Sequence, residues 1–225
     1  MDIRNENYNI LKGYNLLLYF AGSMIMYEPT EECIVDFWQQ GIITKLPVSS
    51  SNPNFAKAAS QLRSSCADKS LCLKNLREDY GRLFTEQGVP LAPAFESLYN
   101  HVSESDKNNP NVSDFYDSYG WVSKYKGKIK DDHLGIELLF LTLLVEKYLV
   151  LDDQVCVVEM RGEIRRFIDQ HIFSWIRNWN SKMQEFSKTL CYKGIATLIY
   201  ACVQDIYSLC SNTPSTFIQP EFLKN

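Results

Sequence analysis

The sequence of 225 residues has little of what a catalytic or metal-binding site usually needs. It has only three histidines, and no glycine-rich phosphate loop, Gly-x-Ser-x-Gly elbow or His-Glu-x-x-His run. Its seven cysteines form an odd count with no Cys-x-x-Cys pair and no regular spacing. This argues against both a disulfide framework and a zinc site, so we expect reduced, half-buried thiols. These absences favour a protein that is not an enzyme and needs no cofactor.

The chain also lacks an excess of positive charge and a long apolar run. Its 23 Lys+Arg against 27 Asp+Glu give a net charge of −4, and its longest lysine cluster, residues 124–130, is interrupted by Gly127 and followed by Asp131 and Asp132. We therefore expect no nucleic-acid partner. No signal-peptide pattern is visible at the N-terminus, and the most apolar stretches, 16–26 and 138–145, are shorter than the roughly 20 residues that span a bilayer. We expect a cytoplasmic protein without stable membrane insertion.

Aromatic residues and helical periodicity are abundant. The 13 Tyr, 12 Phe and 4 Trp exceed the needs of a minimal core; most should be buried, and some could line a binding surface. Apolar residues recur with helical spacing in nearly every segment, which predicts one all-α domain over 1–225 with about nine to eleven helices. The expected helices are 8–27, a short one from Thr30 to near Gly41, 55–66, 71–84, 115–122, one opening at Asp132, 153–173, 174–186 and 190–209. Flexible loops are expected near 47–53, 85–93 and 103–114.

The most apolar predicted helix begins with polar residues. Asp132 can cap free N–H groups at its start, and His133 can project from its first turn. Two interpretations stay open for this pair: a simple cap beside a satisfied histidine, or a donor and acceptor presented at a cleft. His133 and Glu137 are four residues apart and share a helix face, so they could hold a metal or make one hydrogen bond.

Five segments resemble one known family in the family's order. They are Glu78-Asp79-Tyr80-Gly81-Arg82-Leu83-Phe84, Pro93-Ala94-Phe95-Glu96-Ser97-Leu98-Tyr99, Phe115-Tyr116-Asp117-Ser118-Tyr119-Gly120, Asp132-His133-Leu134-Gly135-Ile136-Glu137-Leu138 and Phe167-Ile168-Asp169-Gln170-His171-Ile172-Phe173-Ser174-Trp175. Together they resemble the TorD/DmsD/NarJ family of cytoplasmic chaperones for molybdoenzyme maturation, most closely its TorD/DmsD branch. Each motif is weak alone, but five in order are specific.

The resemblance implies an all-helical chaperone of anaerobic respiration. Such a chaperone binds the twin-arginine signal peptide, the apo form of a molybdenum-cofactor oxidoreductase, or both, assists cofactor insertion and delays export. The family's peptide-binding region corresponds to Phe95, Ser97, Tyr99, Asp132 and His133. A leader that is basic and then apolar needs acidic groups beside apolar ones. We expect Asp131, Asp132 and Glu96 to meet the arginines, and Phe95, Tyr99 and Trp121 to form the apolar wall.

Two other functions remain possible at this stage. The protein could be an assembly factor of the nitrate-reductase type, which binds a leaderless catalytic subunit. It could also be a helical enzyme that uses a metal held by His133 and Glu137. The resemblance allows a monomer or a dimer formed by helix exchange, with a hinge in 103–114. The sequence does not indicate which oxidoreductase is the client.

Overall fold

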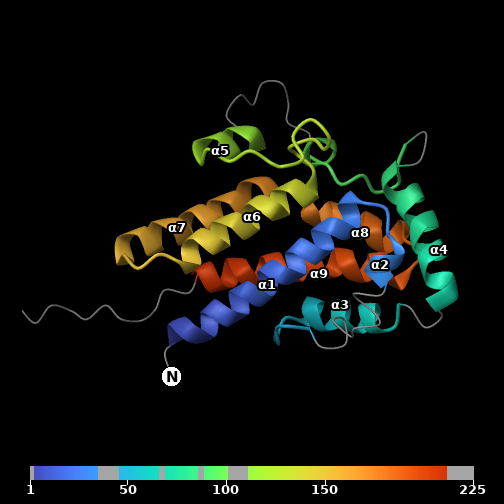
Figure 1. Cartoon of the computed structure of the whole chain (residues 1–225), viewed down its shortest axis with the longest axis horizontal. Helices are drawn as coiled ribbons and strands as arrows, with labels where there is room; N and C mark the ends of the chain where they lie inside the picture. Colours follow the sequence, from blue (N-terminus) through green and yellow to red (C-terminus); the bar gives the residue numbers. More distant parts are fainter. Residues whose placement is uncertain (1–2, 35–45, 66–68, 86–88, 101–110, 212–225) are drawn as a thin grey trace, which may run out of the picture.

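The computed structural model describes residues 3–34, 46–65, 69–85, 89–100 and 111–211, and this part of the chain is all-helical, as predicted (Figure 1). It contains nine α-helices, two π-helical segments and one 3-10 turn. In chain order these are α1 (Ile3–Met26), α2 (Glu31–Ile34), α3 (Pro53–Arg63), α4 (Lys69–Tyr80), η2 (Gly81–Thr85), η3 (Glu96–Leu98), α5 (Val112–Ser118), α6 (Leu134–Leu149), α7 (Gln154–Phe167), η4 (Ile168–Phe173), α8 (Ile176–Phe186) and α9 (Leu190–Ser211).

Helix α9 lies at the centre of the fold. It packs against α1, α3, α7 and α8, while α6 packs between α1 and α7 (Figure 1). The side chains of α9 are buried on most of its faces, as expected of a helix that is apolar nearly all round. By length and composition α9 alone, among the helices in the described ranges, could cross a membrane, but 61% of its apolar stretch is buried inside the protein.

Helices α1 and α6 approach closely at two glycines. A Cβ atom added to Gly22 would lie 3.8 Å from the backbone of Gly135, and one added to Gly135 would overlap the side chain of Met26. This contact holds the first turn of α6 against α1. The start of α6, where the candidate residues lie, is therefore fixed by packing.

Several predicted boundaries were wrong by a few residues. The helix predicted at 115–122 is α5, which begins at Val112, inside the predicted loop 103–114, because the side chain of Asn111 accepts a hydrogen bond from the Ser113 amide. The helix predicted to open at Asp132 begins at Leu134. The predicted helices 71–84 and 153–173 each end in a π-helical segment, η2 and η4. Most of the helix predicted to end near Gly41 lies outside the described residues.

The aromatic residues mainly fill the core, as expected. Phe115 and Tyr116 of α5 meet Phe140 of α6 and Phe167 of α7 in one cluster, with ring centroids 4.7–6.4 Å apart. The prediction of reduced thiols was wrong at Cys72, which is disulfide-bonded. Spacing along the sequence does not report which Cβ atoms lie close in space, and that distance decides whether a disulfide forms.

Candidate functional site

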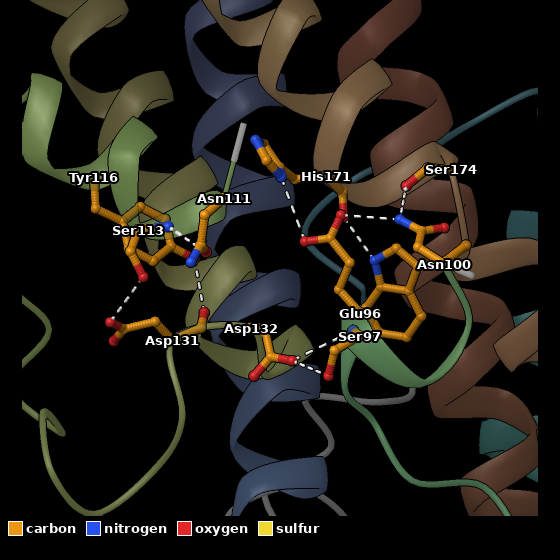
Figure 2. A network of polar contacts seen from close by, with 11 residues as sticks. Glu96, Ser97, Asn100, Asn111, Ser113, Tyr116, Asp131, Asp132, His171 and Ser174 are labelled. Carbon is orange, nitrogen blue, oxygen red and sulfur yellow. Dashed lines mark hydrogen bonds and ion pairs between the residues drawn. The ribbon is translucent and has the colours of Figure 1, made fainter. Parts of the chain in front are cut away.

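Three segments far apart in the sequence meet at the start of α6 (Figure 2). They are the η3 segment 95–100, residues 131–133, and the stretch 171–175 at the end of η4. Backbone hydrogen bonds join the first two: the Glu96 amide donates to Asp132 O at 2.9 Å, and the Leu134 amide donates to Ala94 O at 2.9 Å. Phe95 and His133 form an isolated antiparallel bridge. The structure thus brings together Phe95, Glu96, Ser97, Tyr99, Asp131, Asp132 and His133, which we call the acidic patch.

The two aspartates of the acidic patch hold the neighbouring elements η3 and α5. Asp132 Oδ2 accepts hydrogen bonds from Ser97 Oγ at 2.5 Å and from the Ser97 amide at 3.3 Å. Asp131 Oδ2 accepts one from Ser113 Oγ at 3.1 Å. Both side chains are partly exposed, so a cationic partner can compete for them.

His133, rather than Asp132, caps α6. Its Nδ1 accepts a hydrogen bond from the Gly135 amide at 3.0 Å, and its ring meets that of Phe95 edge-on with centroids 5.0 Å apart. The residue is only 7% exposed, and this burial lowers its pKa to about 4. The expected cap by Asp132 and the projecting histidine were therefore wrong: His133 is neutral near pH 7 and turned into the protein.

Glu96 joins the patch to η4. Its Oε2 lies 3.3 Å from Nδ1 of His171, and its Oε1 accepts a hydrogen bond from Asn100 Nδ2 at 3.0 Å. Asn100 also donates to Ser174 Oγ at 3.0 Å (Figure 2). His171 was not predicted as a site residue, although it lies in one of the five family-like segments. The π-helical turn that carries His171 was not foreseen, and such turns are frequent at functional sites.

The aromatic members of the patch carry lysines on their rings. Lys130 Nζ lies 5.7 Å from the ring centroid of Phe95, and Lys182 Nζ lies 4.8 Å from that of Tyr99. Tyr99 also stacks on Trp175, with centroids 5.3 Å apart. These ring faces therefore already attract cations.

Trp121 was expected in the apolar wall. Its ring contacts Tyr116 and Phe140, with centroids 4.8 and 5.2 Å apart, so these contacts lie in the aromatic core beside α5 and α6. The structure gives the candidate wall a different apolar member, Leu98, which is 54% exposed on η3. Nothing in the sequence pattern distinguished Leu98 from a core leucine.

Glu137 is a buried carboxyl beside the patch. It is 0% exposed, and neither of its oxygens has a hydrogen-bond partner among the residues described. Burial raises its pKa well above the ordinary range, and the negative charges of Glu96 and Asp132 add to the effect. In the described ranges no three His, Cys, Asp or Glu side chains are grouped so that they could hold a metal.

The first family-like segment, 78–84, has a different place in the structure. Asp79 is 1% exposed and accepts hydrogen bonds from the Lys188 amide at 3.0 Å, from the Thr189 amide and hydroxyl at 2.9 Å each, and from Arg82 Nη1 at 3.0 Å. It therefore ties the end of α4 to the start of α9. This segment stabilises the fold and does not join the patch.

Comparison with known proteins identifies the family. A family model described as the nitrate reductase delta subunit matches residues 50–181, which is more than half of the chain and includes the whole acidic patch. No curated protein sequence gives a significant match. The five ordered segments, the all-helical fold and this match agree. The chain belongs to the nitrate reductase delta subunit family, the NarJ/TorD type of molybdoenzyme assembly chaperone.

Proposed function

We propose that the protein binds the twin-arginine signal peptide of a molybdoenzyme precursor at the acidic patch, as TorD/DmsD-type chaperones do, and delays export until the cofactor is inserted. The observation that carries this proposal is the convergence of segments 95–100, 131–133 and 171–175 at one place. Family membership makes a molybdoenzyme subunit the partner, and the chemistry of the patch favours a basic segment of that partner.

The chemistry suits an arginine pair followed by apolar residues. Asp131 and Asp132 are partly exposed. In the described part of the chain, their carboxylates accept hydrogen bonds only from neutral serine groups. A guanidinium makes charge-assisted hydrogen bonds to carboxylates, which are stronger than bonds from a serine hydroxyl. A leader arginine can displace the lysines from the ring faces of Phe95 and Tyr99. Leu98 offers an exposed apolar contact.

A matched pair of variants tests this assignment. Asp132→Asn removes the charge but keeps an oxygen that can accept from Ser97, so the local fold should persist. We expect calorimetry with a synthetic twin-arginine peptide to show affinity weakened by about tenfold or more, since charge-assisted bonds to one arginine are lost. Ser97→Ala frees the carboxylate of its competitor and should bind at least as well as the wild type. Equal affinity in all three proteins would remove Asp132 from the site.

A second candidate function follows from the description of the family model. That description names a nitrate reductase subunit, which favours an assembly factor that binds a leaderless catalytic subunit. A pull-down from anaerobically grown source cells, followed by mass spectrometry, separates the two functions. Retention of a precursor that still carries its twin-arginine leader supports the leader-binding proposal, and retention of leaderless subunits alone supports the second.

We propose a cytoplasmic site of action, where the precursor is made. A disulfide at Cys72 is unusual for that compartment, because cytosolic reductants keep thiols reduced. Although the structure shows the disulfide of Cys72 formed, thiol labelling in acid-quenched cells should therefore find it reduced in that compartment. Finding it fully oxidised in those cells would contradict the cytoplasmic location.

A further inference from the structure

Glu137 is a fully buried carboxyl that feels the charges of the patch. It is in the first turn of α6, and it interacts electrostatically with groups of three other segments: Glu96 of η3, Asp132 before α6, and Tyr116 of α5. The indole of Trp175, which precedes α8, lies close enough to affect the pKa of Glu137, but its N–H donates to His171 O at 2.6 Å. The remaining ionisable neighbour is His171, which pairs with Glu96. Glu137 thus faces two carboxylates, with no cation among these groups unless His171 is protonated.

Other buried polar atoms in this region also lack partners among the described residues. They are Nε2 of His171 and the hydroxyl of Tyr99, which stacks on Trp175. A buried polar group without a hydrogen bond costs about 1–3 kcal/mol, so the unpartnered buried carboxyl of Glu137 marks a site where a ligand can supply donors. A neutral donor would satisfy the oxygens of Glu137 but would leave the charges of Glu96 and Asp132 uncompensated.

An arginine side chain fits this requirement better than other ligands. Its planar guanidinium carries five N–H donors in a fork that matches a carboxylate, and its charge is always present. A lysine ammonium is a more strongly hydrated point charge and loses more on burial. The site therefore selects for arginine over lysine, which is the chemical distinction that a twin-arginine reader must make.

We propose that Glu137 is the buried anchor of the patch, that it binds the guanidinium of one leader arginine, and that its proton passes to solvent as the arginine enters. This inference rests on the proposed function and names a residue and a proton step within it. Glu137 is fully buried, so the packing around it must open before the arginine reaches it, and we assign this movement to segment 95–100, which carries Glu96. That movement breaks the 3.3 Å contact of Glu96 with His171 and the 3.0 Å bond of Asn100 to Ser174. Glu96 then shares the same guanidinium.

Calorimetry of the full chain tests the proton step. A synthetic peptide with two adjacent arginines and an apolar tail is titrated near pH 7 in two buffers of different ionisation enthalpy. We expect the wild type to release up to one proton per peptide, since burial raises the pKa of Glu137 in the free protein and a bound guanidinium lowers it in the complex. Glu137→Gln mimics the protonated carboxyl and should fold; it should release no proton and bind about tenfold or more weakly.

Two controls make the result specific. Glu146→Gln lies on the same helix with its side chain exposed and should behave as the wild type. Peptides in which one arginine is replaced by neutral, isosteric citrulline should bind the wild type more weakly, and Glu137→Gln should no longer discriminate against one of them. Unchanged affinity, proton release and discrimination in Glu137→Gln would overturn this inference while leaving leader binding intact. Failure of the wild type to bind the peptide would overturn both proposals.

Discussion

The cap of α6 predicts how stability depends on pH. His133 has a pKa of about 4 in the folded protein against 6.5 in an unfolded chain, because the folded protein buries the ring and uses Nδ1 to accept the Gly135 amide. Between these values the unfolded chain binds a proton that the folded protein does not. The contribution of His133 to the free energy of unfolding is thus fully present above the pKa of the unfolded chain. It is lost as the pH falls toward the pKa of the folded protein. From these two pKa values, the loss near pH 5 is about 2 kcal/mol.

The variant His133→Asn isolates this effect. Asparagine is a good N-cap and does not titrate, so the Gly135 amide keeps an acceptor at every pH. Losing the ring contact with Phe95 lowers stability by an amount that does not depend on pH. Urea unfolding near pH 7.5 and near pH 5 should therefore show the difference between wild type and variant shifting by about 2 kcal/mol in favour of the variant. Parallel pH dependence in the two proteins would refute the assignment of His133 as the buried neutral cap.

Three further predictions concern stability. Glu137→Gln should unfold at a higher urea concentration than the wild type near pH 8, and this difference should close toward pH 4. The reason is that the raised pKa of Glu137 makes the wild type less stable as the pH rises, by at most about 1.4 kcal/mol per pH unit. Asp79→Ala should lower the free energy of unfolding by about 3 kcal/mol or more, because four donors lose their one buried acceptor. The exposed neighbour Glu78→Ala should change it little. Equal shifts of the urea midpoint in both variants would contradict the role of Asp79 in joining α4 to α9. Gly135→Ala should lower the melting temperature, because the added methyl group overlaps Met26 of α1. Gly162 is exposed within α7 with nothing within 4 Å of an added Cβ, so Gly162→Ala should raise the free energy of unfolding by about 0.5–1 kcal/mol. Stabilisation by both variants would refute the close approach of α1 and α6.

Most of the fold could be predicted from the sequence because helices leave a local signal. Apolar residues three and four apart mark the buried face of a helix, and the segments 190–209 and 55–66 correspond to α9 and α3 within a few residues. The ends were less predictable, since a cap depends on which polar side chain turns back to the backbone. At α5 this is Asn111, and at α6 it is His133 rather than its neighbour Asp132.

The candidate site was only partly predictable. The family-like segments placed Phe95, Ser97 and Asp132 in one region, and the structure brings these residues together. The pairing of Glu96 with His171 was not predicted, because it joins positions 75 residues apart and involves a residue in a π-helical turn. Trp121 was expected in the apolar wall beside the patch; its ring is half-buried and packs against the core through Tyr116 and Phe140.

The sequence by itself determined the helical class of this protein, the order of its helices and its family, because periodicity and short motifs are properties of neighbouring residues. Only the tertiary structure decided that His133 is a neutral cap, that Asp79 is a tie between helices and that Glu137 is a buried carboxyl with a raised pKa. The reason is that burial and hydrogen bonding depend on groups brought in from distant segments. The same side chain in water would keep its ordinary pKa and find its partners in the solvent.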